Sequence, residues 1–134
     1  MTTYVDTSAL AKLYVAEADS ADARRHMQAD PVLATSWLTV VELRRVLSKA
    51  LDGADLRQAI RVSEEDLDRI ALINPDERVW RAAADIAAEL GVRSLYAVHL
   101  ACARILDIDN LSVCTFDLRM AQAARHLGFR VVGS

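Results

Sequence analysis

The chain has 134 residues, of which 53% are hydrophobic and 26% are charged, and its formal net charge is −3. This composition excludes a disordered chain, and the negative balance argues against nucleic-acid binding over the whole surface while leaving room for a local basic cleft. No apolar run reaches the ~18 residues of a membrane span, and no basic segment followed by an apolar core marks a secretory signal. We therefore expect a single domain over residues 1–134 that is cytoplasmic, with no membrane partner.

Short apolar strands alternate with helical patterns along the whole chain. In order, the sequence predicts a strand at 3–5, helices at 7–14 and 20–27, a strand at 32–35, helices at 37–47 and 56–70, a strand at 71–73, helices at 77–90 and 94–105, a strand at 112–116, a helix at 118–127 and a strand at 130–132. Because parallel strands are joined by right-handed crossovers, this α/β alternation implies a three-layer α/β/α sandwich with a parallel sheet of about five short strands.

Local signals indicate several of these boundaries. Thr7 and Ser8 are suited to cap the first helix, and Ser94 a later one. Gly91 is placed to end the helix before it. The helix that follows the predicted N-cap Ser36 shows an apolar stripe made of Trp37, Leu38, Val41, Val46 and Leu47.

Other side chains leave more than one interpretation open. Cys102 and Cys114 lie in apolar segments, so we expect them to pack as small hydrophobes rather than bind a metal. Trp37 and Trp80 belong either to the core or to an exposed interaction patch. A group of basic residues forms either a solvated helix face or a surface for RNA or an acidic protein: Arg44, Arg45, Lys49, Arg57, Arg61 and Arg69.

Two aspartates stand between a strand and a helix. Asp6 lies in Y-V-D-T-S-A and Asp117 in C-T-F-D-L-R. On adjacent parallel strands both carboxylates would meet at the carboxyl edge of the sheet, where open α/β sheets bind ligands. Paired carboxylates repel each other, and a shared proton or a hard cation such as Mg²⁺ relieves that repulsion. The alternative is that each aspartate only caps its helix.

Glu42 is a third candidate acid. It lies within the apolar stretch S-W-L-T-V-V-E-L, where a glutamate loses solvation unless it faces a polar cleft or a cation. The alternative is a position at the edge of the stripe from which the carboxylate reaches water or Arg45.

These stretches resemble the motifs of PIN-domain proteins, specifically the VapC-type toxins of type II toxin–antitoxin systems. Y-V-D-T-S-A-L-A-K-L-Y resembles the first-strand motif, S-W-L-T-V-V-E-L the motif of the second acid, and C-T-F-D-L-R-M-A-Q-A-A that of the fourth. The resemblance spans essentially the whole chain and implies a PIN-like fold and Mg²⁺- or Mn²⁺-dependent endoribonuclease activity. It implies that Asp6, Glu42 and Asp117 bind the metal and act in catalysis. Ser8 would be a supporting hydroxyl, although helix capping explains it about as well.

The third acidic motif departs from the family pattern. It reads S-L-Y-A-V-H-L-A, with Tyr96 at the metal-ligand position where the family has an aspartate. A neutral phenol with a pKa near 10 is a poor Mg²⁺ ligand, and its bulk could partly fill the cleft. We interpret His99 as a packing residue rather than a replacement ligand, because histidine matches Mg²⁺ poorly. We therefore expect an impaired nuclease that still folds.

The resemblance also implies partners, namely a VapB-like antitoxin, an RNA substrate, and either a homodimer or a heteromer with the antitoxin. An alternative function is a catalytically inactive PIN-like protein that acts by binding an antitoxin or RNA and needs no cation. A phosphatase or phospho-acceptor domain would need a second acid beside Asp6, whose neighbours are Val5 and Thr7.

Overall fold

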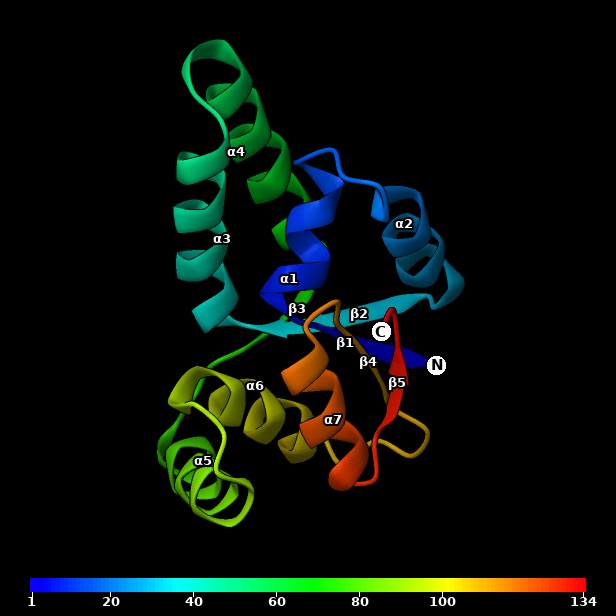
Figure 1. Ribbon diagram of the computed structural model, residues 1–134, viewed down its shortest axis with the longest axis vertical. Coiled ribbons are helices and arrows are strands. Elements are labelled where there is room, and N and C mark those ends of the chain that lie inside the picture. Colours follow the sequence, from blue (N-terminus) through cyan, green and yellow to red (C-terminus); the bar gives the residue numbers. More distant parts are fainter.

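A computed structural model describes residues 1–134 and contains one sheet of five parallel strands, seen nearly edge-on in Figure 1. The strands are β1 (Thr2–Val5), β2 (Val32–Ser36), β3 (Ala71–Ile73), β4 (Ser112–Cys114) and β5 (Arg130–Val132). Their order in the sheet is β3-β2-β1-β4-β5. The strand order therefore reverses beside the central β1, and the crevice outside the carboxyl ends of β1 and β4 is the expected ligand position.

Helices cover both faces of this sheet (Figure 1). On one side lie α1 (Thr7–Leu10), the 3₁₀ turn η1 (Ala11–Leu13), α2 (Ser20–Ala29), α3 (Trp37–Ala50) and α4 (Gly53–Leu67). On the other side lie α5 (Glu77–Leu90), α6 (Ser94–Ile105) and α7 (Leu118–His126). The predicted three-layer α/β/α sandwich with a five-stranded parallel sheet is confirmed.

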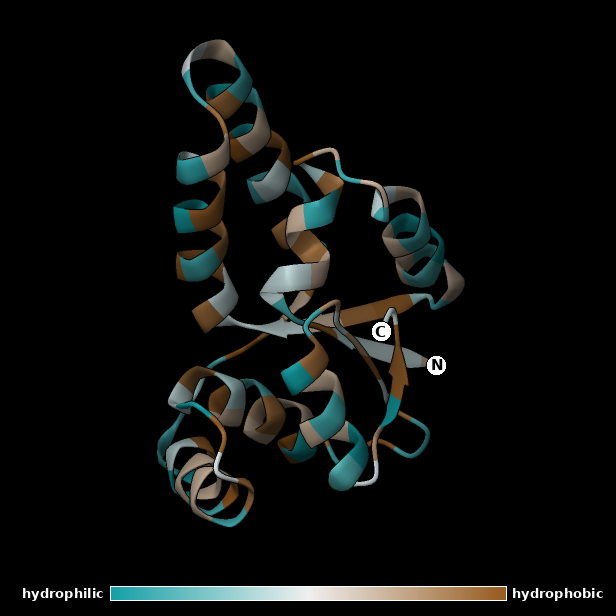
Figure 2. Cartoon of the chain, in the orientation of Figure 1, coloured by the Kyte–Doolittle hydropathy of each residue, from teal (hydrophilic) through white to brown (hydrophobic).

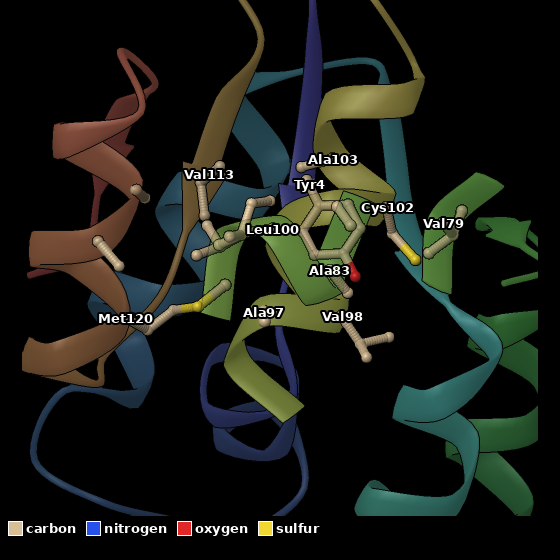
Figure 3. Close-up of a cluster of buried hydrophobic side chains, with 14 of the residues drawn as sticks. Tyr4, Val79, Ala83, Ala97, Val98, Leu100, Cys102, Ala103, Val113 and Met120 are labelled. Atoms are coloured by element: carbon tan, nitrogen blue, oxygen red, sulfur yellow. The ribbon is translucent and has the colours of Figure 1, made fainter. Parts of the chain in front are cut away.

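Alternate strand residues supply two separate cores. Tyr4 and Val113 belong to the cluster under α5, α6 and α7 that Figure 3 shows, whereas Val5 and Cys114 belong to the cluster under α1 to α4. The alternation follows from the two-residue period of a strand, and both faces are apolar because both are covered. In Figure 2 this appears as mainly brown β2 and β5, with teal residues on the outward faces of α3 and α4.

Capping side chains fix where several helices begin. Backbone N–H groups donate to four N-cap side chains: Asp6, Ser36, Asp76 and Asp117. Gly91, with φ 66°, ends α5 in the left-handed conformation as predicted. The prediction that Ser94 caps α6 is wrong: Ser94 is the first helical residue, and the cap position is held by Arg93 without a side-chain hydrogen bond.

The buried face of α3 also differs from the predicted stripe. Trp37 and Val41 are 51% and 69% exposed, while Thr39, Leu43 and Leu47 are buried. Thr35 Oγ1 donates to the Val5 carbonyl over 2.6 Å, so Thr39 donates to Thr35 Oγ1 over 2.7 Å, which lets a threonine begin the buried face. The predicted stripe is thus right for Leu47 and, in part, for Leu38 and Val46, which pack against the cores, and wrong for Trp37 and Val41.

Several predicted boundaries need correction. The first helix, predicted over 7–14, is split into α1 and the 3₁₀ turn η1. The fourth strand ends at Cys114 rather than at 116, where Thr115 Oγ1 donates to Asp6 and the Phe116 amide donates to Ser8 Oγ. Helix α4 covers Gly53–Leu67 rather than 56–70, and residues 68–70 close it with turn hydrogen bonds.

The exposure and ion pairs of the side chains bear on the alternatives that the sequence left open for the tryptophans, the cysteines and the basic residues. Trp80 is 55% exposed, so neither tryptophan belongs to the core. Both cysteines are buried free thiols, as expected. Arg44 and Arg61 pair with glutamates of α4 in the manner of a solvated helix face. No helix combines the length and apolar character needed to cross a membrane.

Candidate active site

Asp6 and Asp117 follow the two adjacent strands at the reversal point of the sheet. Asp6 comes directly after β1, Asp117 comes three residues after β4, and the Asp6 amide donates to the Cys114 carbonyl over 3.2 Å. Each carboxylate also caps a helix, Asp6 accepting from the Ala9 amide and Asp117 from the amides of the first turn of α7. The sequence left open whether each aspartate only caps its helix or also lines a shared cleft. In the structure each of the two aspartates does both.

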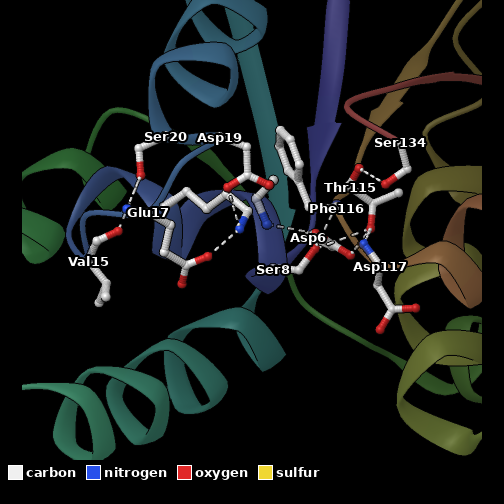
Figure 4. Close-up of polar contacts among 12 residues, drawn as sticks. Asp6, Ser8, Val15, Glu17, Asp19, Ser20, Thr115, Phe116, Asp117 and Ser134 are labelled. Carbon is white, nitrogen blue, oxygen red and sulfur yellow. Dashed lines mark hydrogen bonds and ion pairs between the residues drawn. The ribbon is translucent and has the colours of Figure 1, made fainter.

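Two hydroxyl groups join these strand ends (Figure 4). Thr115 Oγ1 donates to Asp6 Oδ2 over 2.6 Å and accepts from the Asp117 amide over 3.1 Å. Ser8 Oγ donates to Asp6 Oδ1 over 2.7 Å and accepts from the Phe116 amide over 3.0 Å. Ser8 thus contacts the first acid, as the resemblance implied, and does not cap α1.

Asp6 is the most buried acid of the cleft, with 4% of its surface exposed. Burial raises the pKa of Asp6 above its usual value, because the charged form loses hydration. The hydrogen bonds from Thr115 and Ser8 act in the opposite direction and offset only part of that effect. A positive ligand near this carboxylate would favour its ionised form.

Glu42 is held by polar groups from two other elements. Thr7 Oγ1 donates to Glu42 Oε1 over 2.8 Å, and His99 Nε2 lies 2.7 Å from the same oxygen. Burial raises the pKa of Glu42, but the His99 and Thr7 contacts outweigh it and hold the pKa below its usual range. Glu42 therefore faces the polar cleft rather than the solvated edge of α3.

His99 lies between a core tyrosine and this carboxylate. It is 3% exposed, and its Nδ1 is 2.7 Å from the Tyr4 hydroxyl. An ionised Glu42 only accepts hydrogen bonds, so His99 Nε2 carries a proton. In the neutral ring Nδ1 then accepts from Tyr4. His99 is thus buried, as a packing residue would be, and also orients Glu42.

Tyr96 lies in the same cleft, at the start of α6. Its hydroxyl donates to Asp117 Oδ2 over 2.6 Å. Burial raises the pKa of Asp117, but the hydrogen bonds from Tyr96 and the α7 amides outweigh it, so this pKa lies below its usual value. The phenol takes one of the two lone pairs of this oxygen, and Tyr96 lines the cleft beside it.

These groups line one cleft of about 760 Å³ between α1, α3, α6 and the start of α7. Lys12 also lines it, but its ammonium is paired with Glu17 and Asp19 at 2.6 and 2.8 Å. Arg45 is the other cationic lining residue, and no ion pair engages it. The cleft combines an acidic floor with one unpaired guanidinium at its side.

The donor chemistry of the cleft fits a hydrated divalent cation. No three acidic, histidine or cysteine side chains are close enough to hold one ion together. Mg²⁺ prefers oxygen ligands and often binds through one or two carboxylates while it keeps several waters. Among the carboxylate oxygens of Asp6, Glu42 and Asp117, only Oε2 of Glu42 accepts no hydrogen bond. Oδ2 of Asp6 and Oδ2 of Asp117 each accept a single hydrogen bond, so each keeps a lone pair for a cation beside the free Oε2 of Glu42.

Sequence reasoning missed how three residues support these acids. Thr7 was predicted as a helix cap, which is wrong because Asp6 caps α1, and Thr115 was not selected. Tyr4, which contacts His99 rather than an acid, was read only as strand character. The only signal was position: Thr7 directly follows Asp6, and Thr115 precedes Asp117 by two residues. Neither position predicts which carboxylate the hydroxyl meets, because Thr7 contacts Glu42 and Thr115 contacts Asp6.

Comparisons with known proteins agree with this architecture. The family model of the PIN domain matches residues 3–126. Ribonuclease VapC46 of Mycobacterium tuberculosis is 37% identical over 130 residues, which cover 96% of this chain and 95% of that protein. The crystal structure of the same organism's VapC20, a sarcin-ricin loop cleaving toxin, has a TM-score of 0.73 at 20% identity and covers 90% of this chain and 94% of that one. VapBC-5, from the VapBC family of toxin-antitoxin systems of that organism, has a TM-score of 0.65 at 23% identity and covers 99% and 98%.

Proposed function

This chain belongs to the PIN domain family, and from that premise we propose that it is a VapC-like toxin, a divalent-metal-dependent endoribonuclease that Tyr96 impairs. The observation that carries the proposal is the common cleft of Asp6, Glu42 and Asp117 at the reversal point of the sheet. The name of the 37% identical relative, a ribonuclease, supports the choice of reaction.

Asp6, Glu42 and Asp117 would surround Mg²⁺ or Mn²⁺, with one or two of the carboxylates contacting the ion directly and the others through water. The bound cation would neutralise charge at the phosphodiester and lower the pKa of a water molecule. The protein's own part is positioning: Ser8 and Thr115 fix both oxygens of Asp6. Thr7 and His99 fix one oxygen of Glu42, which leaves the other oxygen open to a ligand.

Tyr96 weakens this site in two ways. It supplies no carboxylate at the position where the family has one, and its hydroxyl takes one lone pair of Oδ2 of Asp117. Loss of a ligand or of its support commonly lowers metal affinity or activity about ten-fold or more. The native chain is therefore a weak nuclease that keeps its fold.

The proposed partners are RNA and a VapB-like antitoxin. The VapBC-5 relative is a member of the VapBC family of toxin-antitoxin systems, which supports an antitoxin partner for this chain. The Tyr96–Asp117 hydrogen bond also favours a second candidate function, a PIN-like protein that no longer cuts and acts by binding the antitoxin or RNA.

The test is cleavage of a pooled cellular RNA in Mg²⁺ or Mn²⁺ by the native chain and by Tyr96→Asp. We expect the variant to cut at least about ten-fold faster and a chelator to abolish that cutting. Tyr96→Phe is the matched control, because it removes the hydroxyl without adding an acid, and we expect it to remain slow. If folded Tyr96→Asp cuts no RNA, the nuclease proposal is wrong and the binding function replaces it.

A further inference from the structure

A second hollow borders the acidic cleft and shares one wall with it. This hollow, of about 530 Å³, lies between the end of α5, the turn into α6 and the outer side of α7. Tyr96 lines both hollows, so its ring separates the acidic cleft from the second space. A chain-like ligand that crosses the cleft over Tyr96 would enter this second hollow next.

The charge of the second hollow is opposite to that of the cleft. Its lining includes Arg93, Arg119 and His126 against a single acid, Glu89. The acidic cleft has Asp6, Glu17, Glu42 and Asp117 against two cations, Lys12 and Arg45. A phosphate that would be repelled from the floor of the cleft would be attracted to its neighbour.

The two arginines of the hollow are also free to bind a ligand. Neither Arg93 nor Arg119 makes an ion pair or a side-chain hydrogen bond, and both are exposed. Five other surface arginines are paired with carboxylates, namely Arg25, Arg44, Arg61, Arg78 and Arg81. Arg45, Arg57, Arg69, Arg104 and Arg130 are also without an ion pair, but none of them lines this hollow. A guanidinium without a partner keeps its five donors for phosphate oxygens.

Both guanidinium groups lie close to the wall that the hollows share. Arg93, Arg119 and Tyr96 all line the same hollow. The Arg119 amide also donates to Asp117 Oδ1 over 2.9 Å, which ties the base of this side chain to the cleft.

We propose that the hollow between α5 and α7 is a phosphate subsite in which Arg93 and Arg119 bind the RNA strand next to the phosphodiester held over the acidic cleft. The proposal rests on the proposed function for the identity of the ligand. Arg45 lies at the cleft on α3, so cationic groups stand both in the cleft and in the hollow beside it. Repeated phosphates suit this arrangement, and a single strand suits an open hollow better than a duplex does.

The test is the affinity for a fluorescein-labelled, single-stranded oligoribonucleotide of mixed sequence, measured by anisotropy at several salt concentrations. A chelator is present throughout, so that no cleavage occurs. We expect the double variant Arg93→Gln/Arg119→Gln to bind about ten-fold more weakly. The slope of log affinity against log salt should fall by about 1.4, since each phosphate contact to a single strand contributes roughly 0.7.

The chain supplies a matched control in a third hollow. Arg104 and Arg130 are also unpaired and line a hollow at the far end of α6, but Asp107 and Asp109 line it too. We expect Arg104→Gln/Arg130→Gln to leave affinity and salt slope nearly unchanged. Equal losses in both double variants would show a diffuse electrostatic effect and overturn the subsite.

Cleavage by Tyr96→Asp separates failure of the subsite from failure of the function. In that background the two substitutions at Arg93 and Arg119 should raise KM and leave kcat nearly unchanged. Cleavage with an unaltered KM would refute the subsite and keep the nuclease. RNA binding that depends on the two arginines without any cleavage would keep the subsite and refute the nuclease.

If the substitutions spare RNA binding and instead weaken a complex with an antitoxin, the hollow binds protein and the proposal is wrong.

Discussion

The hydroxyl of Tyr96 donates a hydrogen bond of 2.6 Å to Oδ2 of Asp117. The phenol takes one of the two lone pairs of this oxygen, so a cation that binds Asp117 Oδ2 must share the oxygen with a neutral hydroxyl. We therefore expect the native side chain to lower metal affinity by crowding one acid as well as by lacking another.

We predict a graded Mn²⁺ affinity across two substitutions at this position. Tyr96→Phe frees one lone pair of Asp117 Oδ2 and should strengthen Mn²⁺ binding modestly, by less than the roughly ten-fold effect of a full ligand. Tyr96→Asp adds a carboxylate as well and should strengthen it about ten-fold or more. Isothermal titration of the folded proteins measures both values without any RNA. Equal affinity of the native chain and Tyr96→Phe would show that the phenol does not compete with the metal.

A second prediction concerns the tautomer of His99. The Tyr4 hydroxyl meets Nδ1 and Glu42 meets Nε2, so the neutral ring should carry its proton on Nε2. Nitrogen-15 chemical shifts of the ring report the protonated nitrogen directly. In Tyr4→Phe, Nδ1 loses its buried donor, and we expect a mixed tautomer and a loss of about 1–3 kcal/mol in unfolding free energy.

The tautomer of His99 also affects how firmly Glu42 is held, and therefore the binding of a metal ion. Only the Nε2–H tautomer can donate to Glu42 Oε1, so Tyr4→Phe should loosen that carboxylate and weaken Mn²⁺ binding in the Tyr96→Asp background. A single Nε2–H tautomer that persists in Tyr4→Phe would show that Glu42 alone fixes the ring.

The third prediction compares two buried threonines. Thr115→Val keeps the side-chain shape but removes the donor to the buried Asp6 and the acceptor of the Asp117 amide, and we expect a loss of about 2 kcal/mol, mainly because one partner is a carboxylate. Thr39→Val is the control, since it removes only a bond between two hydroxyl groups and should cost about 1 kcal/mol. Urea unfolding measures both losses. Equal costs would show that Asp6 gains nothing special from Thr115.

The fold was predictable because its signals are local and repeated. Strand–helix alternation and the positions of Asp6 and Asp117 at strand ends follow from patterns that one stretch of chain carries alone. The buried face of α3 was not predictable in this way, because Thr39 looks polar until Thr35 supplies its partner. The choice of face depends on the sheet below and not on the helix.

The site shows the same division between local and distant information. The three acids and Tyr96 are recognisable from short motifs, yet the contact of Tyr96 with Asp117 joins residues 21 positions apart. Likewise, His99 meets Glu42 across 57 positions and Tyr4 across 95. Such pairs depend on tertiary packing, which explains why sequence reasoning read His99 as packing alone and missed Thr7 and Thr115 as supports.

The last prediction uses a tyrosine outside the cleft. Tyr14 donates to Asp66 Oδ2 over 2.7 Å and so ties the turn after α1 to α4. Burial, with the Asp66 hydrogen bond and charge, raises the pKa of Tyr14 well above its usual value of about 10. Since the folded pKa exceeds the unfolded one, this stabilisation is complete below about pH 10 and is lost as the pH rises further.

Tyr14→Phe should therefore be less stable than the native chain by about 1 kcal/mol at pH 7, the usual net value of a hydrogen bond. The difference should shrink above about pH 10, because the native chain loses the contribution that the variant never had. Urea unfolding of both proteins at pH 7, 9 and 11 measures the trend, with circular dichroism as the check that the variant folds. A difference that stays constant through pH 11 would mean that the Tyr14 proton is not coupled to folding.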